Sequence, residues 1–122
     1  MSKKSHYEIG LELEDLIVDY LKEIDTKARR TKASGSSTEI ADVLNKYFYI
    51  EAKKINKENL PIKRRVWYKL CNKIPINSLK IPLYILQNIF EETFVVLQLE
   101  DFINLFKETV KELKCQEEER KS

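Results

Sequence analysis

The stretch that decides the fold of this chain is Asp42-Val43-Leu44-Asn45-Lys46-Tyr47-Phe48-Tyr49-Ile50-Glu51-Ala52-Lys53. Its second half is rich in aromatic and β-branched residues, which favour a strand over 47–53. The apolar run at 40–44 predicts a second strand. Only Asn45-Lys46 separates the two runs, and that spacing is short enough for a tight hairpin. A hairpin here returns Asp42 to the side of Glu51.

The polar residues of this hairpin predict a chemistry. Side chains alternate along a strand, so Glu51 and Lys53 leave the same face. Two carboxylates, from Asp42 and Glu51, and one ammonium group then meet at one point. Carboxylate oxygens are ligands that Mg²⁺ prefers, and a nearby lysine suits a water that attacks a phosphate ester. A surface ion pair is the ordinary alternative for a Glu-x-Lys sequence.

The remaining chain predicts one mixed sheet flanked by helices. We expect helices over 7–24, 57–72 and 101–113, because the first and last place apolar residues at three- and four-residue spacing and Pro61 suits the first turn of the second. Strands are expected over 81–88 and 93–99. The order is helix, hairpin, helix, two strands, helix, which indicates an α/β chain. Residues 1–114 are expected to form one domain and 115–122 a frayed, charged tail.

Three aromatic residues, Trp67, Phe94 and Phe102, are expected in the core, with stacking on a nucleic-acid base as the alternative for Trp67.

Positive charge is concentrated around the hairpin, although the formal net charge of the 122 residues is only +2. Between 53 and 73 the only acidic residue is Glu58, and the basic residues are Lys53, Lys54, Lys57, Lys63, Arg64, Arg65, Lys69 and Lys73. A second basic cluster, from Lys27 to Lys32, precedes the hairpin. Such a distribution around a carboxylate pair predicts a polyanionic partner, and a solvated lysine-rich surface is the alternative.

Composition excludes several other classes. The single histidine, His6, argues against a histidine metal cluster or a Ser-His-Asp triad. Two glycines cannot form a dinucleotide-binding or P-loop motif. Cys71 and Cys115 are expected to be free thiols. The N-terminus has no apolar leader and no apolar stretch approaches the roughly 20 residues of a membrane span, so we expect an intracellular, cytoplasmic protein.

These residues, in this order, resemble the PD-(D/E)XK nuclease superfamily, and within it the archaeal-type Holliday junction resolvases and their phage relatives. The family's helix glutamate is matched by Glu14, with Glu12 as the neighbouring alternative. Its basic residue before a Ser/Gly segment is matched by Lys32 and Ser36, with lysine where arginine is common. Its Asp and Glu-x-Lys motifs are matched by Asp42 and by Glu51-Ala52-Lys53. The likeness covers about 7–106, with a shorter Asp-to-Glu interval than the family pattern.

The resemblance implies a PD-(D/E)XK nuclease-like core. It implies a metal-dependent endodeoxyribonuclease that resolves four-way DNA junctions in recombination and repair. Such an enzyme acts inside the cell that encodes it or, if a phage encodes it, in the cytoplasm of the host. It implies Mg²⁺, replaceable by Mn²⁺, on Asp42, Glu51, the Ala52 carbonyl and Glu14, with Lys53 at the attacking water. It also implies a homodimer. The expected DNA contacts are Lys32, Ser36, Arg29, Arg30, Lys54, Lys63, Arg64, Arg65 and Lys69. Another PD-(D/E)XK DNA endonuclease (nicking, site-specific or repair) and a non-catalytic nucleic-acid-binding module remain open as alternatives.

Overall fold

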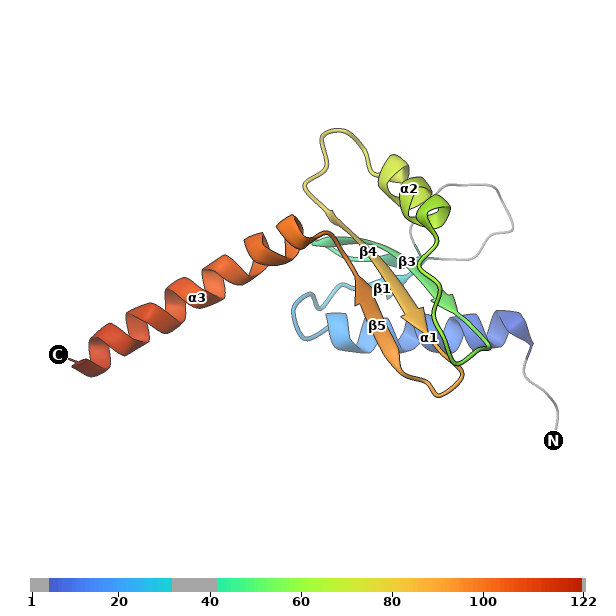
Figure 1. Cartoon of the computed structure of the whole chain (residues 1–122), viewed down its shortest axis with the longest axis horizontal. Helices are drawn as coiled ribbons and strands as arrows, with labels where there is room; N and C mark the ends of the chain where they lie inside the picture. The colour runs from blue at the N-terminus through green and yellow to red at the C-terminus, as the bar shows by residue number, and fades with distance from the viewer. Residues whose placement is uncertain (1–4, 32–41, 122) are drawn as a thin grey trace.

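The computed structural model describes residues 5–31 and 42–121. Over these residues the chain forms a five-stranded mixed sheet with three helices (Figure 1). The predicted α/β class and mixed sheet are therefore confirmed. The elements are α1 (His6–Leu21), β1 (Arg29–Arg30), β2 (Val43–Leu44), β3 (Phe48–Lys54), α2 (Arg64–Lys73), β4 (Ile81–Gln87), β5 (Thr93–Val96) and α3 (Leu99–Lys121).

The strand order is β1-β2-β3-β4-β5, and every neighbouring pair is antiparallel except β3 and β4. The parallel pair requires a crossover connection, which α2 supplies. The predicted hairpin joins β2 and β3, with Val43 opposite Ile50. The buried side chain of Asn45 stabilises its turn: Oδ1 accepts from the backbone N–H of Phe48 at 2.7 Å, and Nδ2 donates to the Phe48 carbonyl at 2.9 Å. Asparagine suits such a turn because its short amide bonds to nearby backbone groups.

Two apolar clusters cover the two faces of the sheet. On one face α1 packs Leu13, Ile17 and Leu21 against Val43, Ile50, Leu83 and Ile85. On the other face Leu70 and Trp67 of α2 pack near Tyr84 and Leu86. β4 alternates between the clusters and is buried on both faces, as expected of a central strand with a parallel neighbour. Trp67 is half-buried there, in agreement with its expected core position.

Several predicted boundaries were wrong. The first helix ends at Leu21 rather than 24, and the fourth and fifth strands end at Gln87 and Val96. The second helix runs from Arg64 to Lys73 rather than over 57–72. A proline disfavours helical geometry in the residue before it, so Pro61 opposes a helix over 57–60. The short edge strand β1, at Arg29–Arg30, was not predicted.

The C-terminal segment also differs from prediction. Residues from 115 continue α3 to Lys121 instead of fraying. The segment consists of good helix formers, and Arg120 and Lys121 at its end complement the helix dipole. Phe94 and Phe102 are not core residues, because their side chains are 50% and 49% exposed.

α3 extends away from the sheet (Figure 1). This helix lies wholly within the described residues and buries none of its side chains. Within 5–31 and 42–121, no helix is long and apolar enough to cross a membrane.

Candidate active site

The candidate site lies at the end of the β2–β3 hairpin that is farther from the Asn45 turn. The backbone N–H of Asp42 donates to the Ile50 carbonyl at 3.0 Å, and Val43 pairs with Ile50. Asp42 therefore lies beside the Ile50–Glu51 segment of β3, close enough for its charge to act on Glu51. The Asp42 side chain is held as well: its Oδ2 accepts from the backbone N–H of Ala52 at 2.8 Å. The predicted return of Asp42 to the side of Glu51 is confirmed.

The register of β3 determines which groups face this point. Glu51 lies opposite the buried Tyr84 of β4, and Lys53 lies opposite Leu86. Both partners belong to the cluster beneath α2, so Glu51 and Lys53 leave the face that α2 covers. Glu51 is half-buried and Lys53 is exposed. Burial raises the pKa of Tyr84, and the charge of the neighbouring Glu51 raises it further.

Asp42 and Glu51 are carboxylates in a poorly solvated position. Burial is the main cause that raises the pKa of each, and the charge of Asp42 raises the pKa of Glu51 further. The Ala52 N–H, which stabilises the charged form, opposes the rise for Asp42. A desolvated carboxylate pair of this kind favours a proton or a cation between its members.

Two ammonium groups act on this pair. Both Lys53 and Lys73 lower the pKa values of Asp42 and Glu51. Lys73 is the last residue of α2, so the crossover helix delivers its charge to the hairpin. Sequence reasoning placed Lys73 in the basic run without assigning it to the site. Its only signal was its place at the end of the basic helix, just before Pro75.

Glu14 brings a third carboxylate from α1. Burial, and next the charge of Asp42, raise the pKa of Glu14 from 4.5 to about 7, while Arg30 opposes the rise. Glu51 contributes in the same direction. The structure therefore couples Glu14 electrostatically to the hairpin pair. Glu12, its predicted alternative, lies exposed on α1.

The carboxylates of the site can be compared with what a divalent cation requires. Among the side chains of the described ranges, no three of His, Cys, Asp and Glu converge tightly enough to enclose a metal ion. Mg²⁺ does not need such a cage, because it usually keeps several waters and binds through one or two carboxylates. Asp42 and Glu51 supply two desolvated carboxylates at one place, and this oxygen chemistry fits Mg²⁺ or Mn²⁺.

The expected DNA contacts fall into three groups. Lys32 and Ser36 lie outside the described residues. Two others have internal partners: Arg30 Nε lies 2.7 Å from Asp15 Oδ1, and Lys54 Nζ donates to the Asn88 carbonyl at 2.8 Å. The remaining residues are exposed, with Arg29 on β1 and the others on or beside α2, namely Lys63, Arg64, Arg65 and Lys69.

The structure thus brings a basic helix surface and the carboxylate pair to the same face of the sheet. The helix α2 links the two, because it carries the basic residues and its last residue, Lys73, acts on Asp42 and Glu51 of the hairpin. No family model matches this chain, and no match was found among curated proteins or solved structures.

Proposed function

We propose that this chain is a metal-dependent, structure-selective endodeoxyribonuclease that resolves four-way DNA junctions. The observation that supports this most directly is the desolvated pair Asp42 and Glu51, with Asp42 held by the Ala52 N–H at 2.8 Å. A carboxylate pair with two lysines nearby is suited to hydrolysis of a phosphodiester. The carboxylates can hold a metal cation, and that cation neutralises the negative charge that builds on the phosphoryl group.

The order of elements supports a PD-(D/E)XK-like core. A helix with Glu14 precedes the hairpin, and the Glu-x-Lys strand pairs in parallel with β4 through a crossover helix. The Asp strand is short, since β2 contains only Val43–Leu44. Asp42 nonetheless continues the pairing through its bond to Ile50.

In this proposal Asp42, Glu51 and the Ala52 carbonyl would hold Mg²⁺ or Mn²⁺. Glu14 does not converge with the two carboxylates closely enough to enclose the ion, and would act on the site through its charge. When bound, the ion supplies neutralisation of charge on the phosphoryl group. Lys53 would hold the attacking water in line with the leaving oxygen. Lys73 would keep the carboxylates ionised, because its charge lowers their pKa values.

The basic residues of α2 would contact the DNA backbone. Such contacts position a duplex without reading its sequence, and they predict an affinity that falls steeply with salt. Two copies related by a two-fold axis would present two sites to opposed strands of a junction, which itself has near two-fold symmetry.

The test is cleavage of an immobile four-way junction beside a linear duplex of matching sequence, with Mg²⁺ and with chelator. Paired symmetric nicks in the junction alone, abolished by chelator and by Glu51→Gln, are the expected result. Glu23→Gln, an exposed carboxylate beyond α1, is the matched control. Equal cutting of both substrates would favour another DNA endonuclease of the same superfamily. Absence of cutting on every DNA form would favour a non-catalytic binding module.

A further inference from the structure

The loop between α2 and β4, residues 74–80, carries two apolar side chains that are fully exposed. Ile76 and Leu79 expose 101% and 98% of their surface. The loop extends beyond the sheet (Figure 1). Its backbone is fixed by a turn in which the Ser78 N–H donates to the Pro75 carbonyl at 2.9 Å. Two apolar groups are therefore held in water on an ordered turn.

This loop borders a groove beside the turn of the β2–β3 hairpin. The groove has a volume of about 420 Å³, and its lining includes Lys46, Tyr47, Leu79 and Lys80. The Ile81 N–H donates to the Tyr47 carbonyl at 3.1 Å, and this bond joins the end of the loop to the hairpin. Sites for small ligands have volumes of about 300–1,000 Å³. A single aromatic base is therefore of suitable size for the groove.

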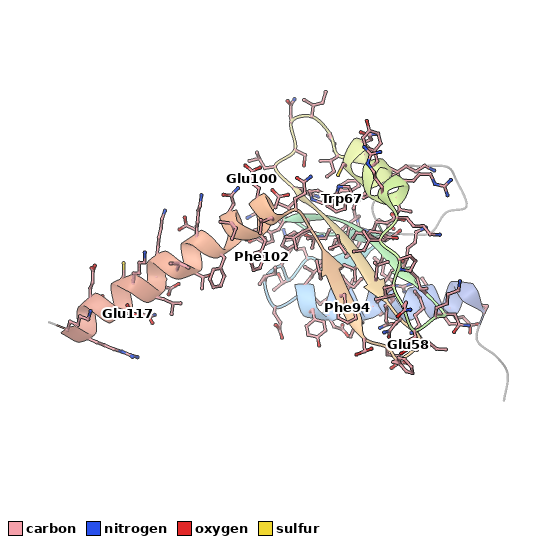
Figure 2. All side chains as sticks on the ribbon, viewed as in Figure 1. Glu58, Trp67, Phe94, Glu100, Phe102 and Glu117 are labelled. Carbon is pink, nitrogen blue, oxygen red and sulfur yellow. The ribbon has the colours of Figure 1, made fainter. Side chains whose placement is uncertain are left out.

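Tyr47 brings an aromatic ring to the groove. Its side chain is 42% exposed, and Lys46 Nζ lies 5.7 Å from the centre of the ring. An exposed ring beside an ammonium group offers the two contacts that an unstacked nucleotide needs, because the base stacks on the ring and the ammonium holds the phosphate. Trp67, by contrast, packs near Tyr84 and Leu86, and Figure 2 shows it between α2 and the sheet.

The charge of the segment around the groove suits a nucleic acid. Between Glu58 and Glu91 the sequence has no acidic residue, and its basic residues are Lys63, Arg64, Arg65, Lys69, Lys73 and Lys80. Lys80 lines the groove, and Lys73, directly before the loop, acts on Asp42 and Glu51. Isoleucine and leucine are also side chains that proteins insert between the base steps of DNA. A polyanion with flat, apolar bases therefore complements both the groove and the loop.

The groove lies within reach of the candidate active site. Tyr47 precedes Glu51 by four residues in one extended segment, a separation of about 13 Å. Successive bases of one DNA strand are about 3.4 Å apart along the duplex axis, so this separation corresponds to about four base steps. A DNA strand with a phosphate at Asp42 and Glu51 can therefore place one of its bases at Tyr47.

We propose that the groove between the hairpin turn and the loop 74–80 binds one unstacked DNA base, which stacks on Tyr47 while Ile76 and Leu79 separate it from its neighbours. Removing a base from the stack costs least where the base is already unpaired, so the groove favours branched over continuous duplex DNA. The proposal rests on the proposed function for its ligand, DNA. It adds the feature of the DNA that the chain recognises.

The experiment measures binding by fluorescence anisotropy in the presence of chelator, so that no DNA is cut. The probe is a labelled duplex with one unpaired thymidine, compared with the same duplex carrying an abasic nucleotide there. Both carry the same phosphate charge. The wild-type chain should bind the thymidine duplex about tenfold more tightly, an effect typical of one base stacked on an aromatic ring. Tyr47→Ala and Leu79→Ser should remove this preference, and Tyr47→Phe should retain it.

Matched controls change the same residue types on other elements. Tyr20→Ala on α1 and Leu113→Ser on α3 replace side chains that are 69% and 51% exposed, and both variants should retain the tenfold preference. Tyr47 and Leu79 are themselves exposed, so circular dichroism should show an unchanged fold for the test variants.

The outcomes separate this proposal from the proposed function. A chain that cuts DNA but binds the two duplexes equally would overturn the base site alone, as would a preference that persists in Tyr47→Ala. A preference that Tyr47→Ala abolishes, in a chain that cuts no DNA, would support the base site and overturn the nuclease. Binding to vesicles of anionic phospholipid that Leu79→Ser abolishes, without any base preference, would assign the loop to a membrane surface instead.

Discussion

The β2–β3 hairpin and α3 differ in the kind of side chain that each buries or exposes. At the hairpin, charged groups are removed from water and held close together: Asp42 bonds to Ala52, and burial raises the pKa values of Asp42, Glu51 and Glu14. On α3, apolar groups stand in water. Each arrangement costs free energy in an isolated chain. Charged groups removed from water, as at the hairpin, indicate a reactive or ion-binding site. Apolar side chains exposed to water, as on α3, indicate a surface that binds a partner.

The largest expected effect concerns the desolvated charge. Asp42→Asn should lower junction cleavage by about a thousandfold or more, because it removes a charged metal ligand from the reacting centre. The amide oxygen can still accept from Ala52, so the hairpin should persist. Single-turnover cleavage and junction binding would be measured together. Normal cleavage by this variant would show that the pair is structural.

The second prediction sharpens the contrast between buried and exposed apolar groups. Ile50→Ala should lower the free energy of unfolding by roughly 2–5 kcal/mol, because Ile50 is fully buried beneath α1. Ile76→Ala is the matched control: this side chain is fully exposed, and the change should stay within about 0.5 kcal/mol. Urea denaturation measures both, and similar losses would contradict the assigned core.

The third prediction uses the pKa of Glu14. Its folded value, about 7, is above its ordinary 4.5, so the folded chain binds this proton more tightly than the unfolded chain. The contribution of Glu14 to stability should therefore be fully present below pH 4.5 and be lost as pH rises through 7. Glu14→Gln should remove about 1–2 kcal/mol of that fall, allowing for solvent screening of a partly exposed group.

Urea denaturation at pH 5 and pH 8 would measure this difference for the wild type and for Glu14→Gln. Glu12→Gln, an exposed neighbour on α1, is the control. An identical pH dependence in wild type and Glu14→Gln would mean that the pKa of Glu14 is not raised in the folded chain.

The smallest expected effect concerns Lys73. Lys73→Met removes a charge that lowers the pKa values of Asp42 and Glu51. Cleavage should fall about tenfold near neutral pH and recover at higher pH, where the carboxylates ionise without help. Lys69→Met, one turn earlier on α2, should weaken DNA binding without moving the pH profile. A uniform loss for Lys73→Met at every pH would assign this lysine to DNA binding instead.

The sequence by itself determined the hairpin and the carboxylate pair. Strand periodicity and the Asn45 turn act within about ten residues, so local rules place Asp42 beside Glu51. The same rules identified the apolar stripe of α3, but they could not tell whether anything covers it.

Only the tertiary structure decided which distant groups reach the site and which apolar groups stay exposed. Lys73 acts on Asp42 because the crossover between β3 and β4 carries α2 over that face. Glu14 is coupled to the pair because α1 packs across the hairpin. Phe94 and Phe102 are of a residue type that is usually buried, but both are about half exposed. Burial depends on how whole elements pack and not on residue type or spacing alone.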